Sequence, residues 1–284
     1  MRRMLVIIAG SACAESPAPA PDDLGQLGLY LFRHFDDSDP TVMGGGFANL
    51  EPHLLTAGQV PPSETTVSMP ILDGADLDGH PIPDGVSASD QVPIAGTGLS
   101  MYPLPAQLTL ILEPNQVCIE SSSTVWAHRT LLTPTGCFAA AECPLSTLTE
   151  VRKETLIAQG WIDQPKEYRW FEFDGPDGAT VDVIAGRSWI DQVYEGDGGI
   201  NSWDQLFHLD VFMENREDPA TTIRWFSVWS SVTITGVSDD LYASMIVHGL
   251  EEALQFGDEF IAGDIVSCTL DRDAEKPERD QSDG

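Results

Sequence analysis

The feature that most limits the possible folds is a change of hydrophobic period in the second half of the chain. Several segments alternate apolar and polar residues, which is the period of a half-buried strand. In one of them Phe207 and Leu209 share one face, while His208 and Asp210 share the other. The segments that read as strands are 124–132, 167–173, 179–190, 204–214 and 221–237. Turn sequences GPDG, EGDGG and ENREDPA separate the last four, which predicts the hairpins of an antiparallel meander.

After this meander the period becomes helical. Ser238 is suited to cap a helix, Asp239 and Asp240 suit its first turn, and the apolar stripe continues to Gly263. The sequence therefore predicts an α+β fold, an antiparallel β-sheet meander packed against a long C-terminal helix. By topology alone, this order is similar to the helix-grip pattern of lipid- and polyketide-binding domains. That resemblance implies a sheet that curls around the terminal helix and encloses an apolar cavity.

The first half of the chain has a different texture. Residues 52–114 hold half of the twenty prolines, together with many glycines and aspartates. We therefore interpret 24–115 as a Pro/Gly-rich β segment, either a small module or a lead-in, with short strands at 67–72 and 107–112. The sheet-and-helix domain is expected to span 116–270. The acidic tail 271–284 has no large apolar residue and is predicted to be disordered.

The N-terminus has the order of a secretory signal: two arginines, a short apolar run and small residues before Cys13. The stretch resembles the lipobox of bacterial lipoproteins, although Gly10 stands where that family usually has Leu. The resemblance implies a signal peptide over 1–12 and a diacylglycerol on Cys13. The Pro/Ala-rich segment 13–23 would then be an extended tether. Cleavage after Ala12-Cys13-Ala14 and an uncleaved N-terminus are the alternatives. The protein is therefore expected to be exported, either anchored to a membrane of the cell envelope or secreted in soluble form.

The charge balance excludes one class of partner. The chain has 45 acidic and 14 basic residues, which gives a formal net charge of −31. Phosphate backbones would be repelled by such a chain, so we expect no nucleic-acid partner. Anionic lipid is disfavoured as a direct docking surface too, which would make a covalent lipid anchor useful.

Four cysteines remain once Cys13 is lipidated or removed, an even number that suggests two disulfides in an exported chain. Cys137 and Cys143 are close enough to form a local loop. That pairing leaves Cys118 with Cys268, which would connect the middle of the chain to its end. No C-x-x-C pair typical of a zinc site is present.

No catalytic motif is found. The six histidines are scattered, and no nucleophile elbow, phosphate-binding loop or dinucleotide fingerprint occurs. Carboxylates are too abundant for any pair to be chosen as acid and base. A weak calcium candidate is formed by Asp76, Asp78 and Asp84, but the closing Glu of a tight calcium loop is missing. No cofactor is expected.

The seven tryptophans are the remaining signal, and they fall in the strand-rich half, several beside arginines. Such a set is typical of an aromatic core with arginines stacked at its rim. The alternative is a cavity for an apolar or ring-bearing ligand, with Trp225, Trp229, Trp189 and Trp170 as candidate lining residues.

Three functions are consistent with the sequence. The favoured one is a non-enzymatic, lipid-anchored envelope protein that binds an apolar small molecule or an envelope protein. The second is a secreted hydrolase with an unidentified carboxylate pair, and the third is a structural or interaction protein. An apolar cavity beneath the C-terminal helix would favour the first, and two close carboxylates with perturbed pKa values would favour the second.

Overall fold

The computed structural model describes residues 19–57, 65–77, 79–80, 82–154, 158–199 and 201–265. A nine-stranded antiparallel sheet organises the chain, in the order β1-β2-β9-β8-β6-β5-β4-β3, with β7 paired to β8. Its strands are β1 (Val67–Ser68), β2 (Val92–Ser100), β3 (Thr124–Leu131), β4 (Leu145–Glu154), β5 (Gln159–Asp174), β6 (Thr180–Trp189), β7 (Tyr194–Glu195), β8 (Asn201–Glu214) and β9 (Thr222–Ile234). From β3 to β9 the long strands pair in chain order, so the predicted meander is confirmed.

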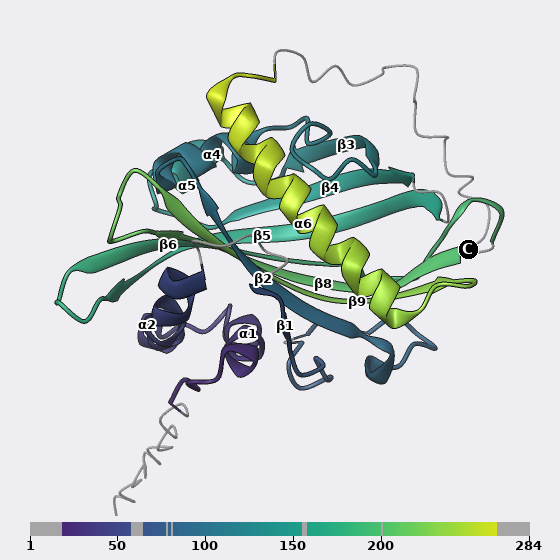
Figure 1. Cartoon of the computed structure of the whole chain (residues 1–284), viewed down its shortest axis with the longest axis horizontal. Coiled ribbons are helices and arrows are strands. Elements are labelled where there is room, and N and C mark those ends of the chain that lie inside the picture. The colour runs from purple at the N-terminus through teal and green to yellow at the C-terminus, as the bar shows by residue number, and fades with distance from the viewer. Residues whose placement is uncertain are drawn as a thin grey trace, which may run out of the picture.

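One long helix, α6 (Asp239–Ala262), crosses the sheet diagonally (Figure 1). Its start and end lie where the sequence predicts them. The Ser238 side chain accepts a hydrogen bond from the Leu241 backbone N–H, and Gly263 ends the helix in the left-handed conformation with φ 77°. The α+β fold class is thereby confirmed.

Two further helices, α1 (Leu24–Arg33) and α2 (Pro40–Ala57), lie on the opposite side of the sheet from α6 (Figure 1). Their apolar residues form the largest core cluster with the inward side chains of β6, β8 and β9. The approach is close: a Cβ added to Gly28 of α1 would lie 3.0 Å from the Trp225 ring. The molecule therefore has three layers, with α1 and α2 on one face of the sheet and α6 on the other.

The part that we interpreted as a β segment is more varied. It supplies β1 and β2, but also α1, α2, the short helix η1 (Ala88–Asp90) and α4 (Leu104–Leu112). The strand expected at 107–112 is wrong, because this run belongs to α4, which begins after Pro103 and buries Gln107, Leu110 and Ile111. A short apolar run does not distinguish a strand from a buried helix. Because β2 pairs with β9, this segment is part of the main sheet.

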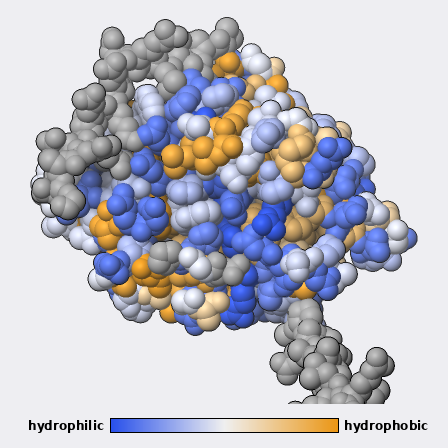
Figure 2. All heavy atoms as spheres, turned by 180° about the vertical axis from the view of Figure 1, so that it is seen from behind, coloured by the Kyte–Doolittle hydropathy of each residue, from blue (hydrophilic) through white to orange (hydrophobic). Residues whose placement is uncertain are grey.

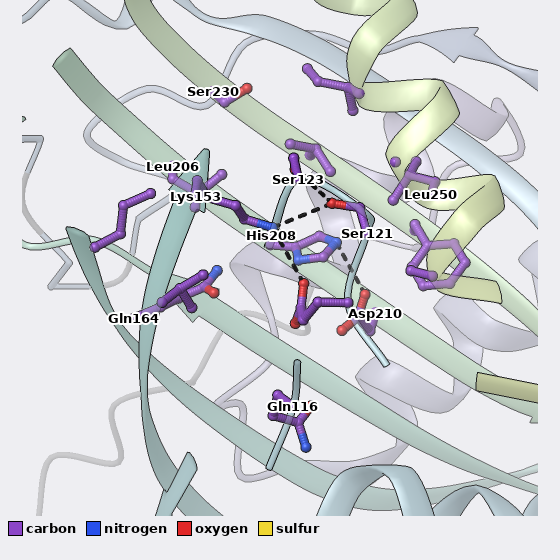
Figure 3. Close-up of a pocket in the computed structure, with 18 of the residues that line it drawn as sticks. Gln116, Ser121, Ser123, Lys153, Gln164, Leu206, His208, Asp210, Ser230 and Leu250 are labelled. Atoms are coloured by element: carbon purple, nitrogen blue, oxygen red, sulfur yellow. Dashed lines mark hydrogen bonds and ion pairs between the residues drawn. The ribbon is translucent and has the colours of Figure 1, made fainter. Parts of the chain in front are cut away.

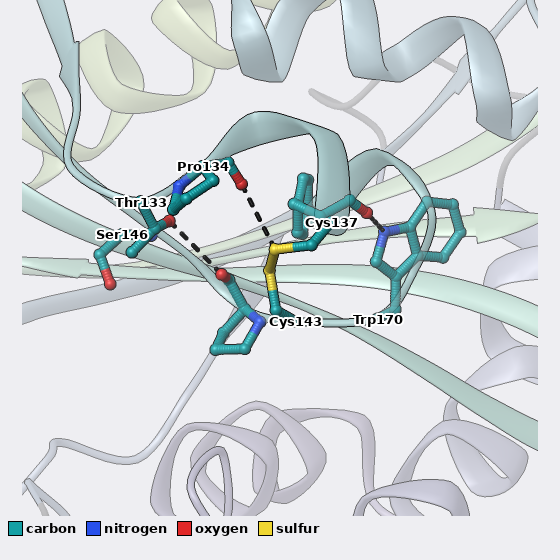
Figure 4. Close-up of a disulfide and its surroundings, with 8 residues drawn as sticks. Thr133, Pro134, Cys137, Cys143, Ser146 and Trp170 are labelled. Atoms are coloured by element: carbon teal, nitrogen blue, oxygen red, sulfur yellow. Dashed lines mark hydrogen bonds between the residues drawn. A yellow bond between two sulfur atoms is a disulfide. The ribbon is translucent and has the colours of Figure 1, made fainter.

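A small disulfide loop follows β3. Cys137 and Cys143 are bonded across the end of α5 (Thr135–Ala139), as predicted (Figure 4). The Trp170 indole donates a 2.8 Å hydrogen bond to the Phe138 carbonyl, which attaches this loop to β5. The other predicted pair joins Cys118 to Cys268, which lies outside the described residues.

Seen from behind, the molecule is mostly hydrophilic, with apolar residues in small groups (Figure 2). The last short helix, η2 (Asp197–Gly199), belongs to the turn between β7 and β8. Among the helices that the structure describes, none has the length and apolar content needed to span a bilayer.

Candidate functional site

A pocket of about 300 Å³ lies between the sheet and α6. Its walls come from α4, residues 116–123, the strands β3, β4, β5, β8 and β9, and one face of α6. The volume is at the lower end of the range typical of small-molecule sites. The pocket therefore suits a small or single-chain ligand.

On β8 and β9, the side chains that face the pocket are apolar toward one end of the strands. These side chains alternate with the ones that pack against α1, because successive residues of a strand point to opposite faces. On the side opposite the sheet, α6 lines the pocket with residues about one helical turn apart. The apolar lining of β8, β9 and α6 comprises Trp203, Leu206, Phe212, Phe226, Val228, Val232, Ile234, Met245, Ile246, Leu250 and Ala253.

Polar contacts hold α6 over this space at three places. The Tyr242 hydroxyl donates a 2.9 Å hydrogen bond to Ser230 on β9. Glu252 accepts a 3.0 Å bond from the Ser122 backbone, and Asp258 accepts a 2.8 Å bond from the Met101 backbone. Burial raises the pKa of Tyr242 to about 12, so its hydroxyl stays protonated at neutral pH. The roof of the pocket is thus attached at both ends and in the middle.

Three ionisable side chains meet on the sheet side of the pocket. Lys166 on β5 donates to one oxygen of Asp210 on β8. The Nε2 atom of His208 lies 3.1 Å from the other oxygen. The register brings them together, since Ser188 on β6 is opposite Lys166 on one side and His208 on the other. The three side chains form one charged group in the pocket lining.

A glycine makes this arrangement possible. Gly186 lies on β6 between Tyr168 and Asp210 in the sheet. A Cβ at this position would be 2.7 Å from the Tyr168 ring and 3.1 Å from Cε of Lys166. The absence of a side chain therefore lets Lys166 pass over β6 to reach Asp210.

The electrostatics of the group follow from burial and mutual charge. Burial acts to raise the pKa of Asp210, but the nearby His208 and Lys166 outweigh it and lower the value to about 2. Burial also lowers the pKa of His208, despite the attraction of Asp210, so its imidazole is neutral at pH 7. For Lys166, burial acts to lower the pKa, but Asp210 outweighs it and the net direction is up. Lysine and aspartate are thus both ionised.

A second charged pair lies on the other side of the pocket. Nζ of Lys153 lies 3.6 Å from Oε2 of Glu120 and donates a 2.6 Å hydrogen bond to the Thr124 hydroxyl. Burial acts to raise the pKa of Glu120, but Lys153 and the other pocket cations outweigh it, and the pKa is lowered. Figure 3 shows Lys153, Ser121, His208 and Asp210 pointing into the same space beneath α6.

Two arginines complete the lining, and they differ in how well they are paired. Arg129 on β3 donates a 2.7 Å hydrogen bond to the Ile111 carbonyl and so satisfies the C-terminal end of α4. Arg224 on β9 lies between two aromatic rings, 4.7 Å from the centre of Phe212 and 4.6 Å from that of Phe226. Its Nε and Nη1 atoms are buried and have no hydrogen-bond partner among the described residues.

The two carboxylates of the pocket do not suit the role of a general acid at neutral pH. A carboxyl that acts as a general acid at neutral pH needs a raised pKa, whereas the pKa values of Glu120 and Asp210 are both lowered. Within the described part of the chain, no group of three His, Cys, Asp or Glu residues is placed to hold a metal ion. Apolar walls with fixed charges suit an amphipathic molecule.

The four tryptophans that we expected to line a cavity lie elsewhere, and this prediction is corrected. Trp225 and Trp229 are fully buried on the opposite face, where they pack against α1. Trp189 packs against the same core cluster and stacks on His80, with ring centres 3.8 Å apart. Trp170 is attached to the disulfide loop. The alternation along β9 was read correctly, but the face with the larger rings is the dry core.

The other predicted site residues are not brought together as a site. Asp76 is buried and accepts a 2.7 Å hydrogen bond from Arg33 Nε, so its carboxylate already has a cationic partner. Asp84 is exposed, and Asp78 lies outside the described residues. Cys13, the predicted lipidation site, also lies outside them.

Sequence reasoning missed the charged residues of the pocket. His208 and Asp210 were assigned to one strand face, but a polar face normally indicates solvent. The signal that could have found them is the set of neighbours on the same sheet face. Phe226, Val228 and Val232 of the next strand are too apolar for an exposed surface. Lys166 and Arg224 were missed because only the cross-strand register places them in the pocket.

Comparisons with known proteins give a general likeness only. No protein-family model matches the sequence, and no curated protein matches it significantly. A STAR-related lipid transfer protein from Xanthomonas axonopodis is 8% identical, with 60% of this chain and 85% of that chain covered and a TM-score of 0.39. The lipid transfer and protein localization domain of human StarD13 is 8% identical, with 75% and 94% covered and a TM-score of 0.38. The functional argument therefore rests on the pocket itself.

Proposed function

We propose that this protein is a binding protein that holds an amphipathic small molecule between its sheet and its C-terminal helix. The observation that carries the proposal is the pocket of about 300 Å³, with apolar walls from β8, β9 and α6 and ionised side chains on its floor. A concave site with apolar walls and a few fixed polar groups is the usual form of a small-molecule site. The apolar walls would bind the hydrocarbon part of the ligand.

A substitution that fills the pocket tests this function. Ala253 lines the pocket from α6, so Ala253→Phe places a ring in the ligand space. His248→Phe is the matched control, since His248 lies on the same helix and its side chain is 70% exposed. We expect native mass spectrometry to detect a co-purified or added amphiphile on the wild type and on His248→Phe, and to detect much less on Ala253→Phe. Equal occupancy of all three proteins would refute a binding site at this position.

We further propose that the binding domain is exported and anchored to a membrane of the cell envelope through lipid on Cys13. The sequence supports this by its signal-like N-terminus and by the Pro/Ala-rich stretch that follows. Export would also suit a chain with a disulfide between Cys137 and Cys143. Replacing Cys13 with Ser should release the protein from the membrane fraction, and continued retention would refute the anchor.

A further inference from the structure

The pocket carries the opposite charge balance from the rest of the protein. Its lining contains four permanent cations, namely Arg129, Lys153, Lys166 and Arg224, and two carboxylates. His208 is neutral at pH 7, so the lining has an excess of two positive charges. The whole chain has a net charge of −31. Cations therefore outnumber carboxylates in the pocket lining, although the chain as a whole is strongly acidic.

The cations differ in what they already bind. Lys166 is paired with Asp210, Lys153 lies 3.6 Å from Glu120, and Arg129 donates to backbone carbonyls of α4. Arg224 has no ion pair with any described residue, although it is only 6% exposed. Its buried Nε and Nη1 groups have no acceptor in the described part of the chain. A buried guanidinium in this state needs acceptors for these two groups, because the carboxylates of Asp210 and Asp258 act on its charge without accepting hydrogen bonds from them.

The position of Arg224 in the pocket determines the orientation that a bound ligand would take. The rings of Phe212 and Phe226 hold the guanidinium at the α4 side of the pocket. A Cβ added to Gly257 of α6 would lie 3.2 Å from Nη1 and 3.1 Å from Leu110 of α4. The apolar residues Val232, Ile234 and Met245 line the pocket farther along the antiparallel strands and toward the start of α6. A head group near Arg224 would thus leave its chain among apolar side chains.

We propose that the ligand is an anionic amphiphile, a single hydrocarbon chain with a carboxylate head that binds Arg224. This inference rests on the proposed binding function and specifies the ligand of the same pocket. A carboxylate matches the planar guanidinium, which can donate two parallel hydrogen bonds to it. The head group would supply the acceptor that the protein does not provide.

The experiment compares three twelve-carbon probes that differ in the head group: dodecanoate, dodecanol and dodecylamine. Each is titrated by calorimetry, below its micelle concentration, into delipidated full-length protein at pH 7.5. We expect dodecanoate to bind with a Kd at least about tenfold lower than that of dodecanol, with dodecylamine weakest. Arg224→Met should raise the Kd of dodecanoate about tenfold and leave that of dodecanol nearly unchanged.

Arg152→Met is the matched control, since it removes the same charge from an arginine outside the pocket that pairs with Asp197. It should leave all three Kd values unchanged. If dodecanol or dodecylamine binds the wild type as tightly as dodecanoate, the charge inference is wrong and the binding function stands. If none of the probes binds, the binding function itself falls, and this inference with it. Should Arg224→Met not fold, the wild-type series decides alone.

Discussion

The pairing of Lys166 with Asp210 gives the sharpest test of how the pocket floor is held. Lys166→Met keeps the length of the aliphatic chain over Gly186 and removes the ammonium group. Asp210, whose side chain is 7% exposed, would then keep a neutral histidine at 3.1 Å and the more distant charge of Arg224. Breaking a buried ion pair by removing one partner typically costs about 3–5 kcal/mol, because the other charge is left uncompensated. We expect a loss of that size in the free energy of unfolding at pH 7.

The pKa of Asp210 gives an independent magnitude. Its folded value of about 2 lies below the ordinary 3.8, so ionisation of this carboxyl stabilises the fold by roughly 2 kcal/mol at neutral pH. In Lys166→Met the pKa of Asp210 should rise, and this contribution should shrink or reverse.

A double-mutant cycle in urea, on delipidated protein, separates the pair from the general effect of each change. The double variant Lys166→Met with Asp210→Leu should recover much of the stability lost in Lys166→Met alone, because no buried charge remains. Arg152→Met, which breaks a more exposed pair, should cost less than about 1 kcal/mol. A Lys166→Met loss below about 1 kcal/mol, or strict additivity in the cycle, would refute the view that these charges depend on each other.

Three further predictions concern stability. Gly186→Ala should lower the free energy of unfolding by about 1–3 kcal/mol, because the new Cβ overlaps the Tyr168 ring. Gly136→Ala is the control, since Gly136 lies in a helix with open space around it and its replacement should cause no loss. Urea denaturation compares the two variants. Cys137→Ser opens a loop with a sequence separation of 6 and should cost roughly 2 kcal/mol, seen as a lower Tm under oxidising conditions only. On acidification, the free energy of unfolding should fall as the pH drops below about 6.5, since unfolded chains protonate His208 more readily than folded ones. It should fall again between about pH 4 and 2 as Asp210 is protonated. His208→Gln should abolish the first decrease and leave the second.

Much of the fold follows from local sequence signals. The ends of α6 are specified by Ser238 and Gly263, whose roles depend only on neighbouring backbone, and the long strands from β5 onward show the period of two. The strands β2 and β4 were not predicted. VPIAGTGLS in β2 has a proline and two glycines, and it becomes a strand because its backbone pairs with β9, far away in sequence. The run 107–112 was misread for the same reason, since burial against the fold makes it helical.

The site was less predictable than the fold, because alternation shows that a strand has two different faces without showing what covers each one. Along β9, Trp225 and Trp229 are on one face, and Phe226 and Val228 are on the other. Nothing local indicates that α1 covers the first face tightly and α6 covers the second with space beneath it.

The covered face explains why the ionisable residues are there. A face that carries large apolar side chains together with Arg224 and Asp210 is unsuited to solvent, because it exposes hydrocarbon, and unsuited to a dry core, because it buries charge. Such a face is stable only if the charges find partners and the remaining space is filled. Lys166 fulfils the first requirement for one oxygen of Asp210, whereas the buried Nε and Nη1 atoms of Arg224 have no hydrogen-bond partner among the described residues. This face is therefore suited to an anionic amphiphile. Its head group would be the partner that Arg224 lacks, and its hydrocarbon chain would fill the remaining space.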